Sequence, residues 1–492
     1  MNKPVQRIAV LCGILTFALL ARATWVQFVQ ADGLANDVHN RRVMIAAFAN
    51  PRGDIVVGGH PITGSRATSG DFKYERTFKD GPMYAAITGY ASQVIGTSLL
   101  EHAYDKVLSG RDERLAFNRA KSIVIGEKSR GGDVITTINP KAQKAAYKGL
   151  TKIRAKGAVV AIEPRTGRIL ALASTPSYDP SVFAGISDGG KFLELDKDKD
   201  KPLNNRALRE TYPPGSTFKI LTAAAALESG LVTDVDAPSG VVSPYPLPLS
   251  STKISSVAGD AACDKVSMKR AMQLSCNNVF LDAADKVGRD KMRTIAEKFG
   301  LNSTFYNEDY ADLAAAKSLY PGKLDRPQTA LTGVGQGSLT TSPLQMAVVT
   351  AALANDGKVM QPHLVDQVRS PDLSTVEKHD PKMLSQAVSA STARKVQQMM
   401  EATVTDGSAR GAQIEGVTVG GKTGTAQHGS NVREQRPYAW FVSYAKQADG
   451  SSPVAVAVFV DPTNMDIPRA DIAGGRLGAP IAKAVMEAVL NK

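Results

Sequence analysis

The feature that most constrains this chain is one long apolar segment near its amino terminus. Residues 8–29 are predominantly apolar, and Arg22 is the one charged side chain among them. The length of this segment is close to the roughly 20 residues that a helix needs to cross a bilayer. No second apolar run of comparable length follows in the sequence. We therefore expect the rest of the chain to form one body on a single side of a membrane.

Two readings of this segment compete, a cleaved signal peptide and a permanent anchor. The apolar core of a signal peptide is about 7–15 residues long, and the sequence at residues 21–23 resembles a cleavage site. Bulky residues follow that site, however, and Trp25 suits a membrane–water interface. We therefore expect an uncleaved single-pass anchor within residues 1–30. Because Lys3 and Arg7 precede it, the positive-inside rule predicts a cytoplasmic amino terminus and an extracytoplasmic body.

Composition narrows the classes of function. The chain has 492 residues, with 59 Lys and Arg against 47 Asp and Glu, and 43% of its residues are hydrophobic. These values do not suit a disordered chain or a polytopic membrane protein. The net charge is +12, but no basic stripe interleaved with aromatic residues is present, so we expect no nucleic-acid partner. The six histidines and three cysteines form no metal-binding motif, so neither a metal nor another cofactor is predicted.

The order of predicted elements after residue 156 indicates an α+β fold. Apolar runs at residues 158–162 and 169–173 flank a turn signature and are typical of a β-hairpin. Helical segments occupy the middle of this region, and a helix is expected at residues 480–490. Strands, then helices, then strands within one domain predict helices packed on an antiparallel sheet. The returning strands are expected at residues 417–425, 438–444 and 454–460.

Residues 31–155 have a mixed pattern and are expected to form a separate, elongated domain ahead of a second domain at residues 156–492. Asn139 is followed by an amphipathic pattern and is expected to begin a helix. The elements expected in this first domain are strands within residues 41–57, a helix at residues 84–104, a strand at residues 134–138 and a helix at residues 140–154.

An SxxK motif lies at a predicted helix start. Two prolines and Gly215 precede Ser216, and an alanine-rich apolar run follows Lys219, as at the amino terminus of a buried helix. Residues three apart lie on one helix face, so Lys219 can take the proton of the Ser216 hydroxyl, and burial lowers the pKa of a lysine toward neutrality. Two further SxxK pairs begin at Ser250, in a predicted loop, and at Ser443, in a predicted strand, where this geometry is not expected.

Two other short motifs accompany this pair. Ser275-Cys276-Asn277 is the one SxN sequence in the chain and follows a helical pattern, and residues 422–425 read KTGT at the end of a predicted strand. Each motif alone is more often structural, as a capping turn or a strand end. Gly424 is expected to let a substrate approach the strand backbone closely. The ordered set SxxK, SxN and KTG is the one that penicillin-binding proteins and serine β-lactamases share.

With these motifs the chain resembles the class B penicillin-binding proteins, and specifically their actinobacterial penicillin-binding protein A type. The resemblance implies a membrane helix, an elongated pedestal domain, and a transpeptidase domain with a central antiparallel sheet flanked by helices. Further stretches that resemble the family are residues 52–55, 173–180, 205–207, 335–337 and 341–345.

The resemblance also implies an activity and partners. It implies a peptidoglycan D,D-transpeptidase, in which a serine attacks a stem peptide ending in D-Ala-D-Ala and the terminal D-Ala leaves. An amine of a neighbouring stem then attacks the acyl-enzyme, and β-lactams trap the serine covalently. The implied partners are stem peptides, lipid-linked nascent glycan, and a polytopic glycosyltransferase of the shape, elongation, division and sporulation (SEDS) type, reached through the anchor and the pedestal.

Roles follow for the first two motifs. By resemblance, Ser216 is the acylated nucleophile and Lys219 is its base. Ser275 relays a proton between Lys219, Lys422 and the leaving amine. Asn277 hydrogen-bonds the substrate amide and Lys219.

Roles follow in the same way for the third motif. Lys422 sets the electric field of the site, and Thr423 and Thr425 hold the substrate carboxylate. The backbone N–H groups of Ser216 and Thr425 are expected to form the oxyanion hole, in which each donor is typically worth about 10²–10³ in rate.

Several related activities remain as alternatives. A D,D-carboxypeptidase is the nearest one, and a β-lactam-binding receptor is another, although receptors of that kind carry several membrane segments. Class D β-lactamases are shorter and lack a domain like residues 31–155. A bifunctional class A enzyme needs a glycosyltransferase domain, for which that region is too short.

Cys263 and Cys276 are a candidate disulfide. Both lie on the extracytoplasmic side if the anchor reading holds, where disulfides persist. Cys276 is the middle residue of the SxN motif, so a bond would fix the loop that carries two site residues. The alternative is two small buried thiols, and the sequence does not decide between them.

Overall fold

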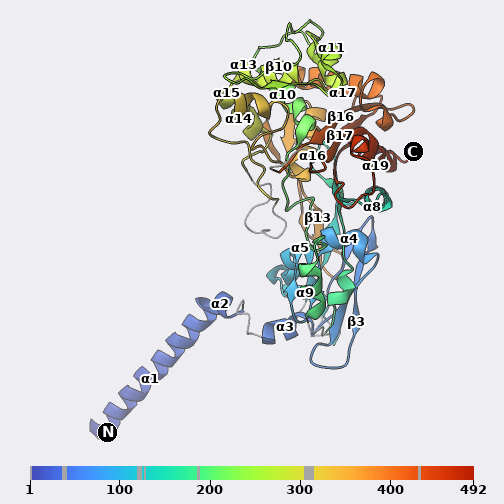
Figure 1. Ribbon diagram of the computed structural model, residues 1–492. Coiled ribbons are helices and arrows are strands. Elements are labelled where there is room, and N and C mark those ends of the chain that lie inside the picture. Colours follow the sequence, from blue (N-terminus) through green and yellow to red (C-terminus); the bar gives the residue numbers. More distant parts are fainter. Residues whose placement is uncertain are drawn as a thin grey trace.

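One long helix projects from an elongated body (Figure 1). The computed structural model describes residues 3–35, 41–118, 125–126, 129–185, 189–303, 315–429 and 434–492. Helix α1 (Lys3–Phe28) has 26 residues, which is about 39 Å at 1.5 Å per residue, against the roughly 30 Å of a bilayer's hydrocarbon core. None of its residues is buried. Within the described part of the chain, it is the one helix long and apolar enough to cross a membrane.

The lobe farther from α1 is built on a five-stranded antiparallel sheet (Figure 1). The predicted hairpin of β8 and β9 is confirmed, and β18 pairs with β8, so early and late parts of the chain meet inside this sheet. Strand β16, which carries the KTG motif, lies at one edge. In sheet order the strands are β16 (Thr418–Ala426), β17 (Tyr438–Lys446), β18 (Val454–Asp461), β8 (Lys156–Ile162) and β9 (Ile169–Thr175).

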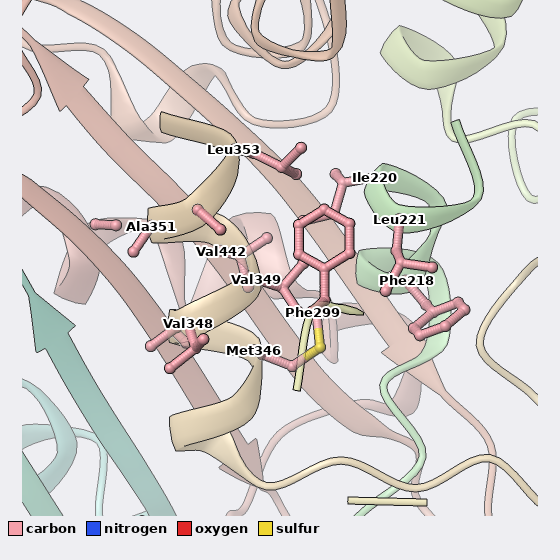
Figure 2. Packing of buried hydrophobic residues seen from close by; sticks show 14 of the residues in the cluster. Phe218, Ile220, Leu221, Phe299, Met346, Val348, Val349, Ala351, Leu353 and Val442 are labelled. Carbon is pink, nitrogen blue, oxygen red and sulfur yellow. The ribbon is translucent and has the colours of Figure 1, made fainter. Parts of the chain in front are cut away.

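Helices cover both faces of this sheet and bury two separate cores. One face packs against α8 (Pro140–Lys152) and α19 (Ala479–Leu490). The other face packs against α16 (Pro343–Ala354), whose side chains are buried nearly all round, and beyond it lies α10 (Lys219–Glu228). Figure 2 shows residues of α10, α16 and β17 in this second core. The predicted α+β architecture is confirmed.

A second five-stranded sheet lies between the two lobes and takes strands from distant parts of the sequence. It joins three strands from before residue 137 to two strands from after residue 364. Asn139 caps α8, as predicted, by accepting hydrogen bonds from two backbone N–H groups. The boundary near residue 155 stays a prediction. The strands of this sheet are β14 (Thr375–Lys378), β13 (Val365–Arg369), β7 (Asp133–Thr136), β1 (Ile55–Val57) and β2 (His60–Pro61).

Two expectations for the first domain were wrong. The strands expected within residues 41–57 are in part a helix, α3 (Arg41–Ala47), because one helical turn places Ile45 and Phe48 together against Phe72. The helix expected at residues 84–104 is interrupted after Gly89, whose φ is 68°. A Cβ there would lie 2.2 Å from the carbonyl oxygen of Ser98, so the chain turns at this glycine. The segments that replace it are α4 (Gly81–Thr88), β5 (Ala91–Ser92), β6 (Gly96–Thr97) and α5 (Leu99–Ala103).

The remaining elements all belong to the body except α2, which follows α1 (Figure 1). They are α2 (Ala31–Ala35), β3 (Thr63–Ala67), β4 (Tyr74–Phe78), α6 (Asp105–Leu108), η1 (Glu113–Leu115), η2 (Pro180–Phe183), α9 (Gly190–Lys197), η3 (Gly215–Phe218), β10 (Tyr245–Pro246), β11 (Lys253–Ile254), α11 (Asp260–Cys263), α12 (Met268–Leu274), α13 (Asn278–Val287), α14 (Arg289–Lys298), α15 (Arg326–Thr332), β12 (Lys358–Met360), β15 (Met383–Gln386), α17 (Ala390–Asp406), η5 (Arg410–Ala412), η6 (Arg469–Asp471) and α18 (Gly474–Leu477).

Candidate active site

Ser216 lies at the start of a helix that rests against strand β16. It is half-buried in η3, which continues directly into α10. The N–H of Gly215 donates to the carbonyl oxygen of Gly335 at 3.0 Å. Gly215 has a φ of 55°, and a Cβ there would lie 2.9 Å from the carbonyl oxygen of Thr425. Glycine before the serine therefore allows the helix start to approach the KTG strand, which brings Ser216 and Thr425 into one neighbourhood.

Lys219 is fully buried one turn after Ser216 and points at the SxN loop. Its Nζ donates to the carbonyl oxygen of Ser275 at 2.7 Å and to Oδ1 of Asn277 at 2.8 Å. It also lies 3.4 Å from Oγ of Ser275 and 5.5 Å from the centre of the Phe280 ring. The structure therefore brings together three of the residues that the sequence assigned to the site.

Ser275 adopts a conformation that non-glycine residues seldom adopt. It ends α12 with a φ of 61° and a ψ of 34°, in the left-handed region. Such a conformation costs of order 1–3 kcal/mol and persists where the surroundings hold it. Here it accompanies a carbonyl group turned to Lys219 and a hydroxyl group 2.8 Å from Nζ of Lys422. The strained residue thus bridges the two lysines of the site.

Lys422 is fully buried on β16. Its Nζ donates to Oγ of Ser275 and to the carbonyl oxygen of Thr423, each at 2.8 Å. Neither Lys422 nor Lys219 has an ion pair with a carboxylate in the described residues. Burial lowers the pKa of Lys422 to about 7. Burial and the charge of Lys422 together hold the pKa of Lys219 well below its usual value, so a neutral amine is available near neutral pH to act as a base.

We expect replacement of Lys422 by methionine to stabilise the folded chain while abolishing its chemistry. The buried ammonium is disfavoured in the folded state, so the unfolded chain binds more protons between pH 7 and pH 10.5. The buried ammonium therefore lowers the free energy of unfolding by its full amount below pH 7, and this cost disappears above pH 10.5. At pH 7, K422M should raise the free energy of unfolding by roughly 1–4 kcal/mol.

Thermal unfolding at pH 7 and above pH 10.5 tests this expectation. The matched control is K446M, which changes a partly exposed lysine near Glu401. The expectation would be contradicted if K422M melted at a lower temperature than the unmodified chain at pH 7. It would also be contradicted if the increase in melting temperature did not shrink as the pH rises.

The threonines of the KTGT sequence are less buried than Lys422 and Gly424. Thr425 is exposed, and Oγ1 of Thr423 lies 3.0 Å from Oγ of Ser408. Gly424 is buried, and a Cβ there would lie 2.9 Å from Cγ2 of Thr217 and 3.0 Å from Cβ of Trp440. A side chain at position 424 would therefore crowd the nucleophile helix and the next strand. The close approach of a substrate to the strand backbone at Gly424 stays a prediction.

The sequence motifs did not reveal several residues that shape the site. Ser408 contacts Thr423, Phe280 lies beside Lys219, and Nε1 of Trp440 donates to the carbonyl oxygen of Pro213 at 2.9 Å. Ser256 accepts a hydrogen bond from the backbone of Asn277. The only sequence signal among them is that Trp440 is one of two tryptophans and lies in a predicted strand.

The other two SxxK pairs do not form comparable sites. Ser250 is exposed, and its Oγ accepts a hydrogen bond from the N–H of Thr252. Ser443 is buried in β17, and its Oγ donates to Sδ of Met486 at 3.7 Å. Within the part of the chain that the structure describes, no cluster of three or more His, Cys, Asp or Glu residues could hold a metal ion.

A disulfide joins Cys263 to Cys276, with 5.6 Å between their Cα atoms. Both residues are fully buried, whereas Cys12 in α1 is free and exposed. The bond ties α11 to the middle of the SxN loop. A crosslink that closes a loop of this length is worth roughly 3 kcal/mol in the chain-entropy model.

We expect reduction of this disulfide to slow acylation of Ser216 at temperatures where the chain stays folded. The loop that it fixes carries Ser275 and Asn277, and a misplacement of about 1 Å can cost about 10²-fold in rate. The rate of acylation by a fluorescent penicillin, measured before and after reduction, gives the effect. In a variant with both cysteines changed to alanine, the reductant should not change this rate. Two cysteines that alkylate freely without reduction would overturn this expectation.

Comparison with known proteins agrees with this geometry. Residues 157–487 match the penicillin-binding protein transpeptidase domain, and residues 52–134 match the penicillin-binding protein A dimerisation domain. The chain is 38% identical to the peptidoglycan D,D-transpeptidase PbpA of Mycolicibacterium smegmatis, over 100% of both chains. It is 37% identical to PbpA of Mycobacterium tuberculosis, over 100% of this chain and 99% of that one.

Solved structures extend the comparison. Penicillin-binding protein A from M. tuberculosis, in its ceftriaxone acyl-enzyme complex, matches with a TM-score of 0.84 and 36% identity, over 91% of this chain and 100% of that chain. The D,D-transpeptidase domain of a peptidoglycan glycosyltransferase from Eggerthella lenta matches with a TM-score of 0.73 and 30% identity, over 90% and 98% of the two chains. The chain therefore belongs to the penicillin-binding protein transpeptidase family, in its class B form.

Proposed function

We propose that this chain is a membrane-anchored peptidoglycan D,D-transpeptidase that cross-links stem peptides through an acyl-enzyme on Ser216. One observation supports this proposal more strongly than any other. The hydroxyl of Ser275 lies between two buried lysines that have no carboxylate partner in the described residues. One of them, Lys219, follows Ser216 by one turn at a helix start. This arrangement supplies a nucleophile, a neutral amine and a proton relay in one place.

In the proposed first step, neutral Lys219 takes the proton of the Ser216 hydroxyl as Oγ attacks the carbonyl carbon of the penultimate D-Ala. Backbone N–H groups of Ser216 and Thr425 would stabilise the oxyanion. The tetrahedral intermediate then breaks its bond to the amine of the terminal D-Ala. The proton reaches that amine from Lys219 through Ser275, and D-Ala leaves.

The second step is the reverse process with a new amine. A stem-peptide amine attacks the acyl-enzyme and loses its proton to Lys219 through Ser275. The bond to Oγ of Ser216 breaks, and the serine recovers a proton. Lys422 would keep the local potential positive, Thr423 and Thr425 would bind the substrate carboxylate, and a second Nδ2–H of Asn277 would bind the substrate amide.

Product analysis separates this proposal from its alternatives. The full chain in detergent, supplied with a polymerised lipid-linked donor, should produce cross-linked muropeptides together with free D-Ala. Trimmed monomers alone would identify a D,D-carboxypeptidase. Fast hydrolysis of the penicilloyl adduct would identify a β-lactamase, and covalent labelling without either product would identify a receptor.

We also propose a division into an anchor at residues 1–30, a pedestal at residues 31–155 and a transpeptidase domain at residues 156–492. The family matches at residues 52–134 and 157–487 support it. The pedestal and α1 are the parts through which a polytopic SEDS-type glycosyltransferase would be reached. Loss of co-purification with such an enzyme after deletion of α1 would support that contact.

We propose one membrane span, with the amino terminus in the cytoplasm and the catalytic domain outside. The helix length and the basic residues Lys3 and Arg7 support this orientation. Alkaline phosphatase fused after Lys492 should be active, because this reporter folds only outside the cytoplasm. An inactive fusion, or a mature amino terminus near Ala23, would refute the topology.

A further inference from the structure

A short segment at the end of the body far from α1 lies against the SxN loop. Residues 255–263, which we call the strap, run from the end of β11 through α11 (Figure 1). The strap is mostly exposed, and Val257 is 94% exposed. Ser256 is the exception in its first half, at 7%. One buried hydroxyl within an exposed loop indicates an anchoring contact.

That contact is made with Asn277. Oγ of Ser256 accepts a hydrogen bond from the backbone N–H of Asn277 at 2.9 Å. The carbonyl oxygen of Ser255 accepts one from Nδ2 of the same asparagine, also at 2.9 Å. The strap therefore holds both the backbone and the side-chain amide of Asn277.

The second of these bonds decides which way the amide faces. With Nδ2 engaged by Ser255, Oδ1 faces Lys219 and accepts from its Nζ at 2.8 Å. With the amide reversed, Nδ2 of Asn277 would face Lys219. Its N–H group could donate to the lysine only when the lysine amine is neutral. The orientation of Asn277 thus affects the protonation of Lys219.

The strap is itself held at three points. A carboxylate oxygen of Asp260 accepts from the N–H of Ser256 at 3.2 Å and from the hydroxyl of Ser243 at 2.7 Å. The Cys263–Cys276 disulfide ties its far end to the residue before Asn277. The carbonyl oxygen of Cys263 also accepts from Nδ2 of Asn278 at 2.8 Å.

We propose that Ser256 is a positioning residue for the transpeptidase reaction, which orients Asn277 and through it sets the acceptor that faces Lys219. The inference rests on the proposed function. Loss of the Ser256 hydroxyl would free the Asn277 backbone and loosen the Ser255 contact. Lys219 would then lose an acceptor for its ammonium form, which lowers its pKa further, while the substrate amide would lose a fixed partner.

The test compares S256A with the unmodified full chain in detergent, by the second-order rate constant for acylation by a fluorescent penicillin across pH. We expect S256A to react about tenfold more slowly, with the acid limb of the pH–rate profile shifted to lower pH. S256T, which keeps the hydroxyl, should recover most of the rate. V257A is the matched control, because it changes an exposed neighbour in the same loop, and it should behave like the unmodified chain.

A double-mutant cycle separates positioning from a general effect on folding. If Ser256 acts through Asn277, S256A should cost little further rate in an N277A background. An unshifted pH profile for S256A, or a full additional loss in that background, would overturn the proposal. If S256A does not fold, S256T decides. Threonine keeps the hydroxyl that contacts Asn277, so S256T should have the same acid limb of the pH–rate profile as the unmodified chain, and a shifted limb would overturn the proposal. Failure of the unmodified chain to label on Ser216 would instead refute the proposed function.

Discussion

S216A is expected to abolish covalent labelling by penicillin and to leave the fold intact. The substitution removes one half-buried oxygen at the start of η3, and no other serine in the described residues sits one helical turn before a buried lysine in this way. Fluorescent penicillin on a denaturing gel measures the labelling, and thermal unfolding checks the fold.

The matched control is S250A, which changes the exposed serine of the SxxK pair in the loop. It should label as well as the unmodified chain. Labelling of S216A would contradict the assignment of Ser216 as the nucleophile.

K219R is expected to lower the acylation rate by about 10²–10⁴-fold, the usual contribution of a positioned base. Arginine keeps the positive charge but is not deprotonated in proteins, so it cannot take the proton of Ser216. Lys219 is fully buried among Ser275, Asn277 and Phe280, so the larger side chain could also disturb packing.

K219M resolves that ambiguity, because methionine fits the volume and removes an amine whose protonated form burial disfavours. It should lose acylation to the same degree while melting at a higher temperature than the unmodified chain. A near-normal acylation rate in either variant would show that Lys219 is not the base.

Much of the candidate site could be predicted because local sequence determines it. Proline and glycine before Ser216 and an alanine-rich run after Lys219 are local signals of a helix start, and the structure has a helix there. The SxN motif follows a helix, as expected, and a second helix begins directly after it. Motif order then predicted that Ser275 and Lys422 would meet, although they are 147 positions apart.

Other features depend on tertiary contacts that no local pattern encodes. The sheet that joins β7 to β13 needs strands that are more than 200 positions apart in the sequence. The turn at Gly89 depends on the approach of Ser98. The packing of Thr217 and Trp440 against Gly424 also depends on elements that are far apart in the sequence.

The same limit explains why Ser256 was missed. A serine in a polar loop carries no signal of its own, and its importance arises only where the strap meets Asn277. The disulfide was foreseen as one of two alternatives because compartment and spacing allowed it, while the hydrogen bonds beside it required the fold.

The central claim is that Ser216 forms the acyl-enzyme. The most direct measurement is the intact mass of the full chain after reaction with a penicillin, followed by peptide mapping of the adduct. We predict one added penicilloyl group per chain, located on the peptide that contains Ser216. An adduct on Ser250 or Ser443, or no stable adduct at all, would contradict the account.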